Sequence, residues 1–153
     1  MKDRLKWPLV VAAIFVVGRV ALERSGAPLA ITNMVSVSVL VTLIFPLYFA
    51  WRISRSGEQH SYKELIKSVL LFAVLARLMV VPTYWLAYVY QWADPRFSES
   101  ASGVVGPDIT AIQAYVLVPL GLTLSWVIGA MIIGGGLGSI LIAVRRRKVR
   151  AAA

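Results

Sequence analysis

The chain has 153 residues, of which 59% are hydrophobic and 15% are charged, and its formal net charge is +9. A soluble domain is usually about 45–50% apolar and about 25% charged, so this composition excludes an ordinary soluble domain and predicts an integral membrane protein. The lack of cysteine excludes disulfides, thiolate nucleophiles and Cys-ligated metals. No linker or repeat divides the sequence, so we expect a single transmembrane domain over 1–153.

Four segments are apolar over about the 20 residues that a helix needs to cross a bilayer. We therefore expect an all-α, four-helix transmembrane bundle with spans at about 7–24, 27–52, 64–92 and 110–144. The first span is the weakest, because Arg19 interrupts it and basic residues precede it as in a signal peptide. Pro28 follows the best small-residue cleavage site, Ser25-Gly26-Ala27, and this argues that the first helix is retained.

Two of the spans begin with helix start signals. Ser61 and Glu64 match a capping box before the third span, and Thr110 and Gln113 match one before the fourth. Pro119 lies in the outer part of the long fourth span, where it permits a kink, and the span either tilts or extends above the membrane.

The distribution of basic residues predicts that both termini lie in the cytoplasm. With this orientation the cytoplasmic segments contain Lys2, Arg4, Lys6, Arg52, Arg55 and the run at 145–148. The outer loops contain only Arg24 and Arg96. Trp7, Trp51 and Trp92 fall at the predicted interfaces, as in an aromatic belt. From its compact, loop-poor form we expect a multi-pass protein of the bacterial inner membrane.

The basic run at 145–150 has two interpretations. It resembles a short phosphate-neutralising tail of a nucleic-acid-binding protein, but it also fits a cytoplasmic anchor that attracts anionic lipids. We favour the anchor, so the expected partners include membrane lipids and exclude nucleic acid.

Side chains suited to metal binding or catalysis are few. The single histidine, His60, has one nearby carboxylate, Glu58, which is far short of a metal-ligand set. Asp94, Glu99 and Asp108 share the long outer loop, but their spacing matches no calcium loop. No nucleophile and base are paired, so we expect no metal, no cofactor and no enzymatic activity.

Glycines in the fourth span favour close helix packing over phosphate binding, since they lie within an apolar helix rather than after a strand. One small-residue stripe contains Gly121, Ser125 and Gly129, and a second contains Gly134 and Gly138. The stripes leave open whether the neighbouring helices belong to this chain, to a second copy or to another membrane protein.

Arg77 is the most informative residue, because it falls near the middle of the third span. A charge at that depth costs about 2.5–3.5 kcal/mol on insertion scales and usually faces a bundle interior or a wet cavity. Helical periodicity places Tyr84 and Tyr88 on the same stripe. With Arg19, Tyr115 and Trp126 they form a predicted outward-facing pocket for a hydrophobic anion or lipid.

Two functions remain open from the sequence. The first is binding or transport of a small hydrophobic anion through this Arg/Tyr pocket; the competing interpretation of Arg77 is a packing role, bonded to carbonyls and tyrosine hydroxyls. The second is a structural or accessory subunit that docks through the glycine-rich fourth helix. Pro46 and Pro82 permit motion in the second and third helices without deciding between these functions.

Overall fold

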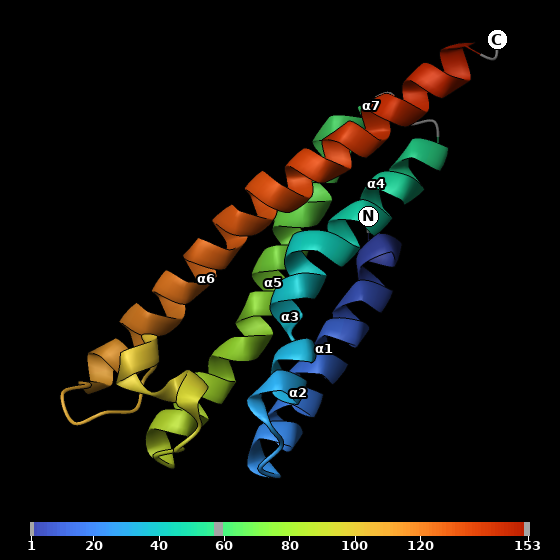
Figure 1. Cartoon of the computed structure of the whole chain (residues 1–153). Helices are drawn as coiled ribbons and strands as arrows, with labels where there is room; N and C mark the ends of the chain where they lie inside the picture. The colour runs from blue at the N-terminus through green and yellow to red at the C-terminus, as the bar shows by residue number, and fades with distance from the viewer. Residues whose placement is uncertain (1, 57–59, 152–153) are drawn as a thin grey trace.

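The computed structural model describes residues 2–56 and 60–151, and these form an all-helical bundle (Figure 1). Four helical stretches are long and apolar enough to cross a membrane: Asp3–Arg24, Leu29–Arg55, Ser61–Val89 and Gln113–Arg147. They agree with the predicted spans to within a few residues at each end. The only strand-like pairing in the described residues is an isolated bridge between Ser98 and Val105.

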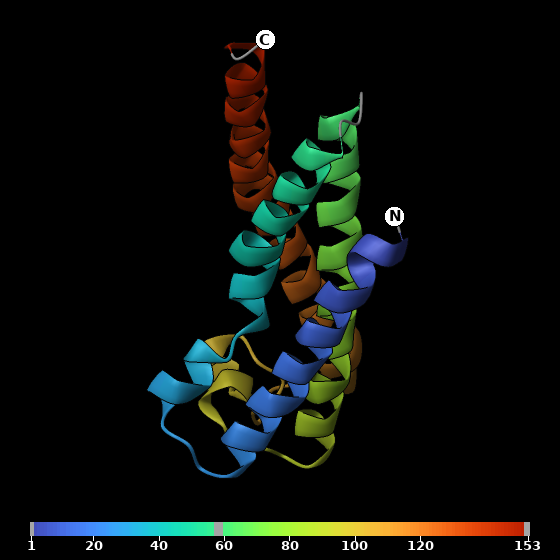
Figure 2. The same cartoon turned by 90° about the vertical axis from the view of Figure 1, so that its right-hand side faces the viewer.

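The first helix, α1 (Lys2–Arg24), is continuous despite Pro8 and packs along α5 (Ser61–Val89). It ends at a tight turn in which Gly26 has φ 75, a conformation that suits glycine. This turn and the 90–112 segment lie at one end of the bundle, which we call the loop end (Figure 2). The end of α4 (Phe45–Arg55), the start of α5 and the arginines of the last helix lie at the other end, which we call the basic end (Figure 1).

The second span is broken rather than continuous. It consists of α2 (Leu29–Met34), a short α3 (Val37–Val39), the π-helical η1 (Leu40–Ile44) and α4 (Phe45–Arg55). At the break Ser36 is extended, with φ −115 and ψ 124, and its Oγ accepts the N–H of Ser38 at 3.2 Å. Serine competes with the helix for backbone hydrogen bonds. From Val37 the helix then runs without interruption to Arg55.

The third span is one helix, α5 (Ser61–Val89), at the centre of the bundle. The predicted capping box at its start is wrong. The N–H of Glu64 donates to the carbonyl of His60, and the Ser61 hydroxyl accepts from Arg146 instead. Arg146 belongs to the fourth span, at the basic end of the bundle. A contact between two helices therefore determines this hydrogen bond of the Ser61 hydroxyl.

The fourth span is a nearly continuous rod made of η4 (Gln113–Leu117), α6 (Val118–Gly129), η5 (Ala130–Gly134) and α7 (Gly135–Ala151). Its predicted capping box is confirmed, since Gln113 Oε1 accepts the N–H of Thr110 at 2.7 Å. Pro119 has no N–H for the carbonyl four residues earlier. That carbonyl, of Tyr115, accepts the indole N–H of Trp85 at 3.0 Å.

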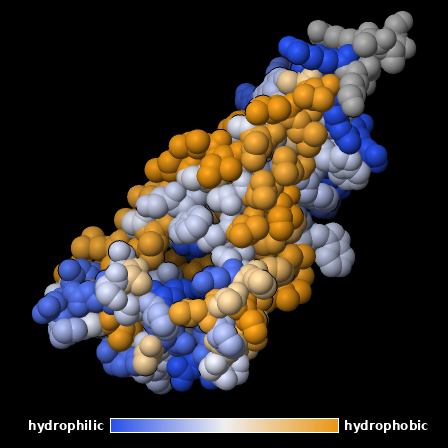
Figure 3. All heavy atoms as spheres, viewed as in Figure 1, coloured by the Kyte–Doolittle hydropathy of each residue, from blue (hydrophilic) through white to orange (hydrophobic). Residues whose placement is uncertain are grey.

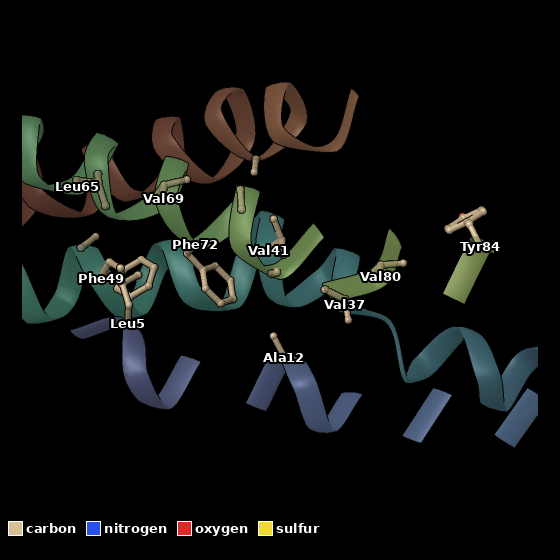
Figure 4. Close-up of a cluster of buried hydrophobic side chains, with 14 of the residues drawn as sticks. Leu5, Ala12, Val37, Val41, Phe49, Leu65, Val69, Phe72, Val80 and Tyr84 are labelled. Carbon is tan, nitrogen blue, oxygen red and sulfur yellow. The ribbon is translucent and has the colours of Figure 1, made fainter. Parts of the chain in front are cut away.

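Helix packing is closest toward the basic end. A Cβ on Gly134 would lie 2.5 Å from the Pro46 ring, and a Cβ on Gly138 would lie 2.9 Å from Leu65. These glycines let the fourth span cross the second and third closely. Figure 4 shows the adjoining core, in which Phe49 and Phe72 meet edge to face with ring centroids 5.8 Å apart.

At the loop end the second and fourth spans diverge (Figure 1), whereas α5 and α6 stay in contact. Figure 1 shows α6 on one side and α2 and α3 on the other, with α5 between them. The loop folds back here through two short 3-10 turns, η2 (Pro95–Phe97) and η3 (Glu99–Ala101). Phe97 is fully buried against Tyr84 and Trp92, with ring centroids 5.2 and 5.6 Å away. Burial of this ring fixes the loop over the diverging helices.

Candidate functional site

Arg77 lies on the buried face of α5 and is only 6% exposed. Its guanidinium lies over the ring of Trp126, 5.2 Å from the centroid. Its Nε is buried without a hydrogen-bond partner, and no hydrogen bond or ion pair joins the side chain to any described residue. A buried charge that lacks hydrogen bonds is costly. The packing interpretation requires bonds to carbonyls and tyrosine hydroxyls, and this geometry does not contain them.

Arg77 lines a cavity of about 180 Å³ among α1, α3, α5 and α6. The cavity is lined by Val16, Arg19, Val37, Ser38, Arg77, Val80, Tyr84, Arg96 and Trp126. Figure 3 shows a hollow toward the loop end on the face viewed in Figure 1, with hydrophilic atoms along its lower edge and hydrophobic surface to one side. The cavity thus combines cationic groups with apolar and aromatic walls.

Arg19 is the second cation of the cavity, and hydrogen bonds to its own helix, α1, and to the 33–36 segment hold its side chain in place. Its Nε donates to Glu23 Oε1 at 2.8 Å, one turn along α1. Its two terminal nitrogens donate to Ser36 Oγ at 3.4 Å and to Asn33 Oδ1 at 3.3 Å. Ser36 lies at the break between α2 and α3, and Asn33 lies in the last turn of α2, so both of these partners come from the residues around the break.

The third cation, Arg96, comes from the loop end and was not among the predicted pocket residues. Its Nη2 lies 3.0 Å from Glu23 Oε2, and its guanidinium lies 4.2 Å from the centroid of the Phe97 ring. Burial lowers the pKa of the Arg96 guanidinium below its ordinary value, and the Glu23 carboxylate opposes that shift. Arginine stays protonated in proteins even so. Because the adjacent Phe97 is buried, Arg96 lies against the bundle rather than in an exposed loop.

The charges of this cluster do not cancel. Arg19, Arg77 and Arg96 contribute three positive charges, and Glu23 contributes one negative charge, so the formal sum is +2. Glu23 contacts two of the arginines and leaves Arg77 unpaired. A partly enclosed site with excess positive charge and arginine donors favours an anionic ligand.

A larger recess of about 640 Å³ adjoins the cavity at the loop end. Arg19, Tyr84 and Arg96 line both spaces. The rim of the recess carries a further cation, Arg24, which lies 3.6 Å from Asp94 and 5.0 Å from the centroid of the Trp92 ring. The shared residues form the boundary between an outer vestibule and the inner cavity at Arg77.

The predicted pocket residues divide into two groups. Arg77, Arg19, Tyr84 and Trp126 come together around the cavity. Tyr88 and Tyr115 are not among its lining residues and instead pack edge to face on each other, with ring centroids 5.4 Å apart. They stabilise the contact between α5 and the start of the fourth span, as does the bond from Trp85 to the Tyr115 carbonyl.

The predicted packing glycines also divide. Gly134 and Gly138 are covered by other helices of this chain, whereas a Cβ added at Gly121 or Gly129 would meet nothing within 4 Å. The Oγ of Ser125, between these two, bonds to the carbonyl of its own helix at Gly121. The stripe of Gly121, Ser125 and Gly129 is therefore open in the single chain.

The described residues contain no group of three or more His, Asp or Glu side chains that would hold a metal ion. Glu58, proposed as the neighbour of His60, lies outside the described residues. At the basic end Arg145 donates to Ser54 at 3.3 Å, and Arg146 lies over the Tyr62 ring. These two arginines contact the neighbouring helices.

Comparison with protein-family models, with curated proteins and with solved structures finds no match for this chain.

Proposed function

We propose that this protein is a multi-pass membrane protein that binds a hydrophobic organic anion, or an anionic lipid, in the cavity formed by Arg19, Arg77 and Arg96. The observation that supports the proposal most directly is Arg77 itself, which is buried in an apolar-walled cavity without an acceptor. An anionic head group would supply that acceptor, and Trp126, Tyr84 and the valines would contact the apolar part.

The distribution of charge supports membrane insertion with both termini in the cytoplasm. Arg52, Arg55 and the 145–148 run lie at the basic end, while Arg24 and Arg96 lie at the loop end in ion pairs with acids. In this orientation the vestibule faces the outside of the cell, and a bacterial inner membrane is the proposed location. Transport is an extension of the same proposal, with a homo-oligomer or a second membrane protein completing a pathway.

Binding to purified protein tests the function. Native mass spectrometry in detergent with phosphatidic acid, a fatty acid and zwitterionic phosphatidylcholine should show retention of the anionic lipids by the wild type. Loss of a charged hydrogen bond costs about 1.5–3 kcal/mol, so Arg77→Gln should weaken their binding at least about tenfold.

The matched control is Arg55→Gln, because Arg55 is an exposed arginine that also lies over a tryptophan, 4.3 Å from the Trp51 ring centroid. This variant should bind as the wild type does. Equal binding by wild type and Arg77→Gln would show that the cavity is not the binding site.

The alternative function, an accessory subunit, has narrower support. Gly134 and Gly138 are already covered within the chain, so docking through the fourth helix would use the open stripe of Gly121, Ser125 and Gly129. Purification from native membranes distinguishes the functions. A stoichiometric partner lost on Gly121→Leu would favour the accessory role, and a chain free of protein partners would favour the binding protein.

A further inference from the structure

We infer that the ligand carries a phosphate monoester head, bound as a dianion between the three arginines and the start of the Val37–Arg55 helix. The apolar chain of the ligand leaves through the side of the bundle between α3 and α6. This inference rests on the proposed function and specifies the ligand class of the same cavity. Three independent features lead to it: a helix terminus, a charge excess and a lateral opening.

The first feature is the terminus created by the break in the second span. The helix that begins at Val37 continues through η1 and α4 to Arg55, and its first residues, Val37 and Ser38, line the cavity. The N–H of Ser38 at this terminus is already bonded to Ser36 Oγ at 3.2 Å, so the terminus acts on an anion chiefly through its partial positive charge. Arg77 lines the same space, is only 6% exposed as a residue, and has a buried Nε without a hydrogen-bond partner.

The second feature is the size of the charge excess. The formal sum of the three arginines and Glu23 is +2. A carboxylate would leave one positive charge uncompensated, whereas a phosphate monoester, with a second pKa near 6, neutralises both at pH 7. Phosphate oxygens also accept hydrogen bonds from several donors at once. Here the donors are the guanidinium groups of Arg19 on α1, Arg77 on α5 and Arg96 in the loop.

The third feature is the position and size of the cavity. At about 180 Å³ the cavity is smaller than the roughly 300–1,000 Å³ of most small-molecule sites, so it suits a head group better than a head group with a long chain. Val37 of α3 and Trp126 of α6 both line it, and Figure 1 shows these two helices apart from each other, with α5 between them. A chain attached to the bound head therefore has an apolar exit toward the membrane.

A pair of ligands of equal shape tests the inference. Dodecyl phosphate and dodecyl sulfate have the same chain and a tetrahedral head, but above about pH 6 only the phosphate is a dianion. Their binding to the full-length protein in excess non-ionic detergent is measured at pH 7.5 and pH 5, together with inorganic phosphate as the head without a chain.

We expect dodecyl phosphate to bind at least tenfold more tightly than dodecyl sulfate at pH 7.5, and the difference to shrink to about twofold at pH 5. The phosphate head changes from dianion to monoanion in this range and the sulfate head does not, so the change reports the ligand charge. Inorganic phosphate should bind at least a hundredfold more weakly than dodecyl phosphate. Arg77→Gln should reduce the preference for phosphate, and Arg77→Lys, which keeps the charge, should retain it with weaker binding.

The other outcomes are distinguishable. Equal affinity for the two amphiphiles at both pH values would overturn the dianion while leaving the hydrophobic-anion function in place. Inorganic phosphate that binds as tightly as dodecyl phosphate would overturn the lateral chain and identify free phosphate as the source of the head. Failure of every ligand to bind would overturn both the inference and the proposed function.

Discussion

Replacing Gly134 with alanine tests the close crossing at the basic end. In an open helical position Gly→Ala stabilises a helix by about 1 kcal/mol. At Gly134, however, the new Cβ would lie 2.5 Å from Pro46 Cγ and 2.9 Å from the carbonyl oxygen of Thr42. Ordinary carbon contacts are about 3.5–4.0 Å, so the second and fourth spans would have to separate.

The expected magnitude follows from the rigidity of both obstacles. Overpacking typically costs about 1–3 kcal/mol, and a proline ring and a backbone carbonyl place this site in the upper part of that range. After subtracting the helix gain of about 1 kcal/mol, we expect Gly134→Ala to lower the free energy of unfolding by about 1–2 kcal/mol.

Gly136→Ala is the matched control, because a Cβ there meets nothing within 4 Å. It should raise the free energy of unfolding by about 1 kcal/mol, which gives a difference of about 2–3 kcal/mol between the variants. Equilibrium unfolding by SDS in mixed detergent micelles, followed by helical circular dichroism, measures both. If Gly134→Ala stabilised the protein as much as Gly136→Ala, the close crossing of these helices would be wrong.

Two further predictions concern the site and the topology. Glu23→Gln removes the anion that contacts Arg19 and Arg96, so dodecyl phosphate should bind severalfold more tightly to this variant. The control, Asp94→Asn at the rim, should change the affinity less. Weaker binding by Glu23→Gln would mean that Glu23 chiefly positions the arginines. Because the chain has no cysteine, single cysteines can report the topology. A membrane-impermeant maleimide applied to intact cells should label Ser100→Cys in the loop but not Ser56→Cys at the basic end. The reverse labelling pattern would show that the topology is the opposite of the proposed one.

The central part of the site was predictable from the sequence because a charge in an apolar helix is conspicuous. Arg77 and Arg19 interrupt otherwise apolar spans, and helical periodicity placed Tyr84 on the stripe of Arg77. Trp126 was also selected, and its ring lies 5.2 Å from the Arg77 guanidinium. Periodicity along one helix says nothing of rotation relative to its neighbours, which is why Tyr88 and Tyr115 were selected although they pair with each other.

Arg96 and the break at Ser36 were missed because their environments depend on distant contacts. Arg96 reads as an ordinary loop residue, and only the burial of Phe97 beside it brings it to Glu23. A signal for the break was present in Asn33 and Ser36, two polar residues near the start of an apolar span. They become informative once Arg19 is known to reach both of them.

The sequence by itself determined the all-helical class, the four long apolar helical segments and the position of a charge within the third, because hydropathy and residue type act locally along the chain. Only the tertiary structure decided where the second span breaks, which arginines converge and which glycines are covered. Those features depend on how helices cross and how the 90–112 segment folds back. The physical reason is that the acceptors of Arg19 and the carboxylate beside Arg96 come from other segments, so no local pattern specifies them.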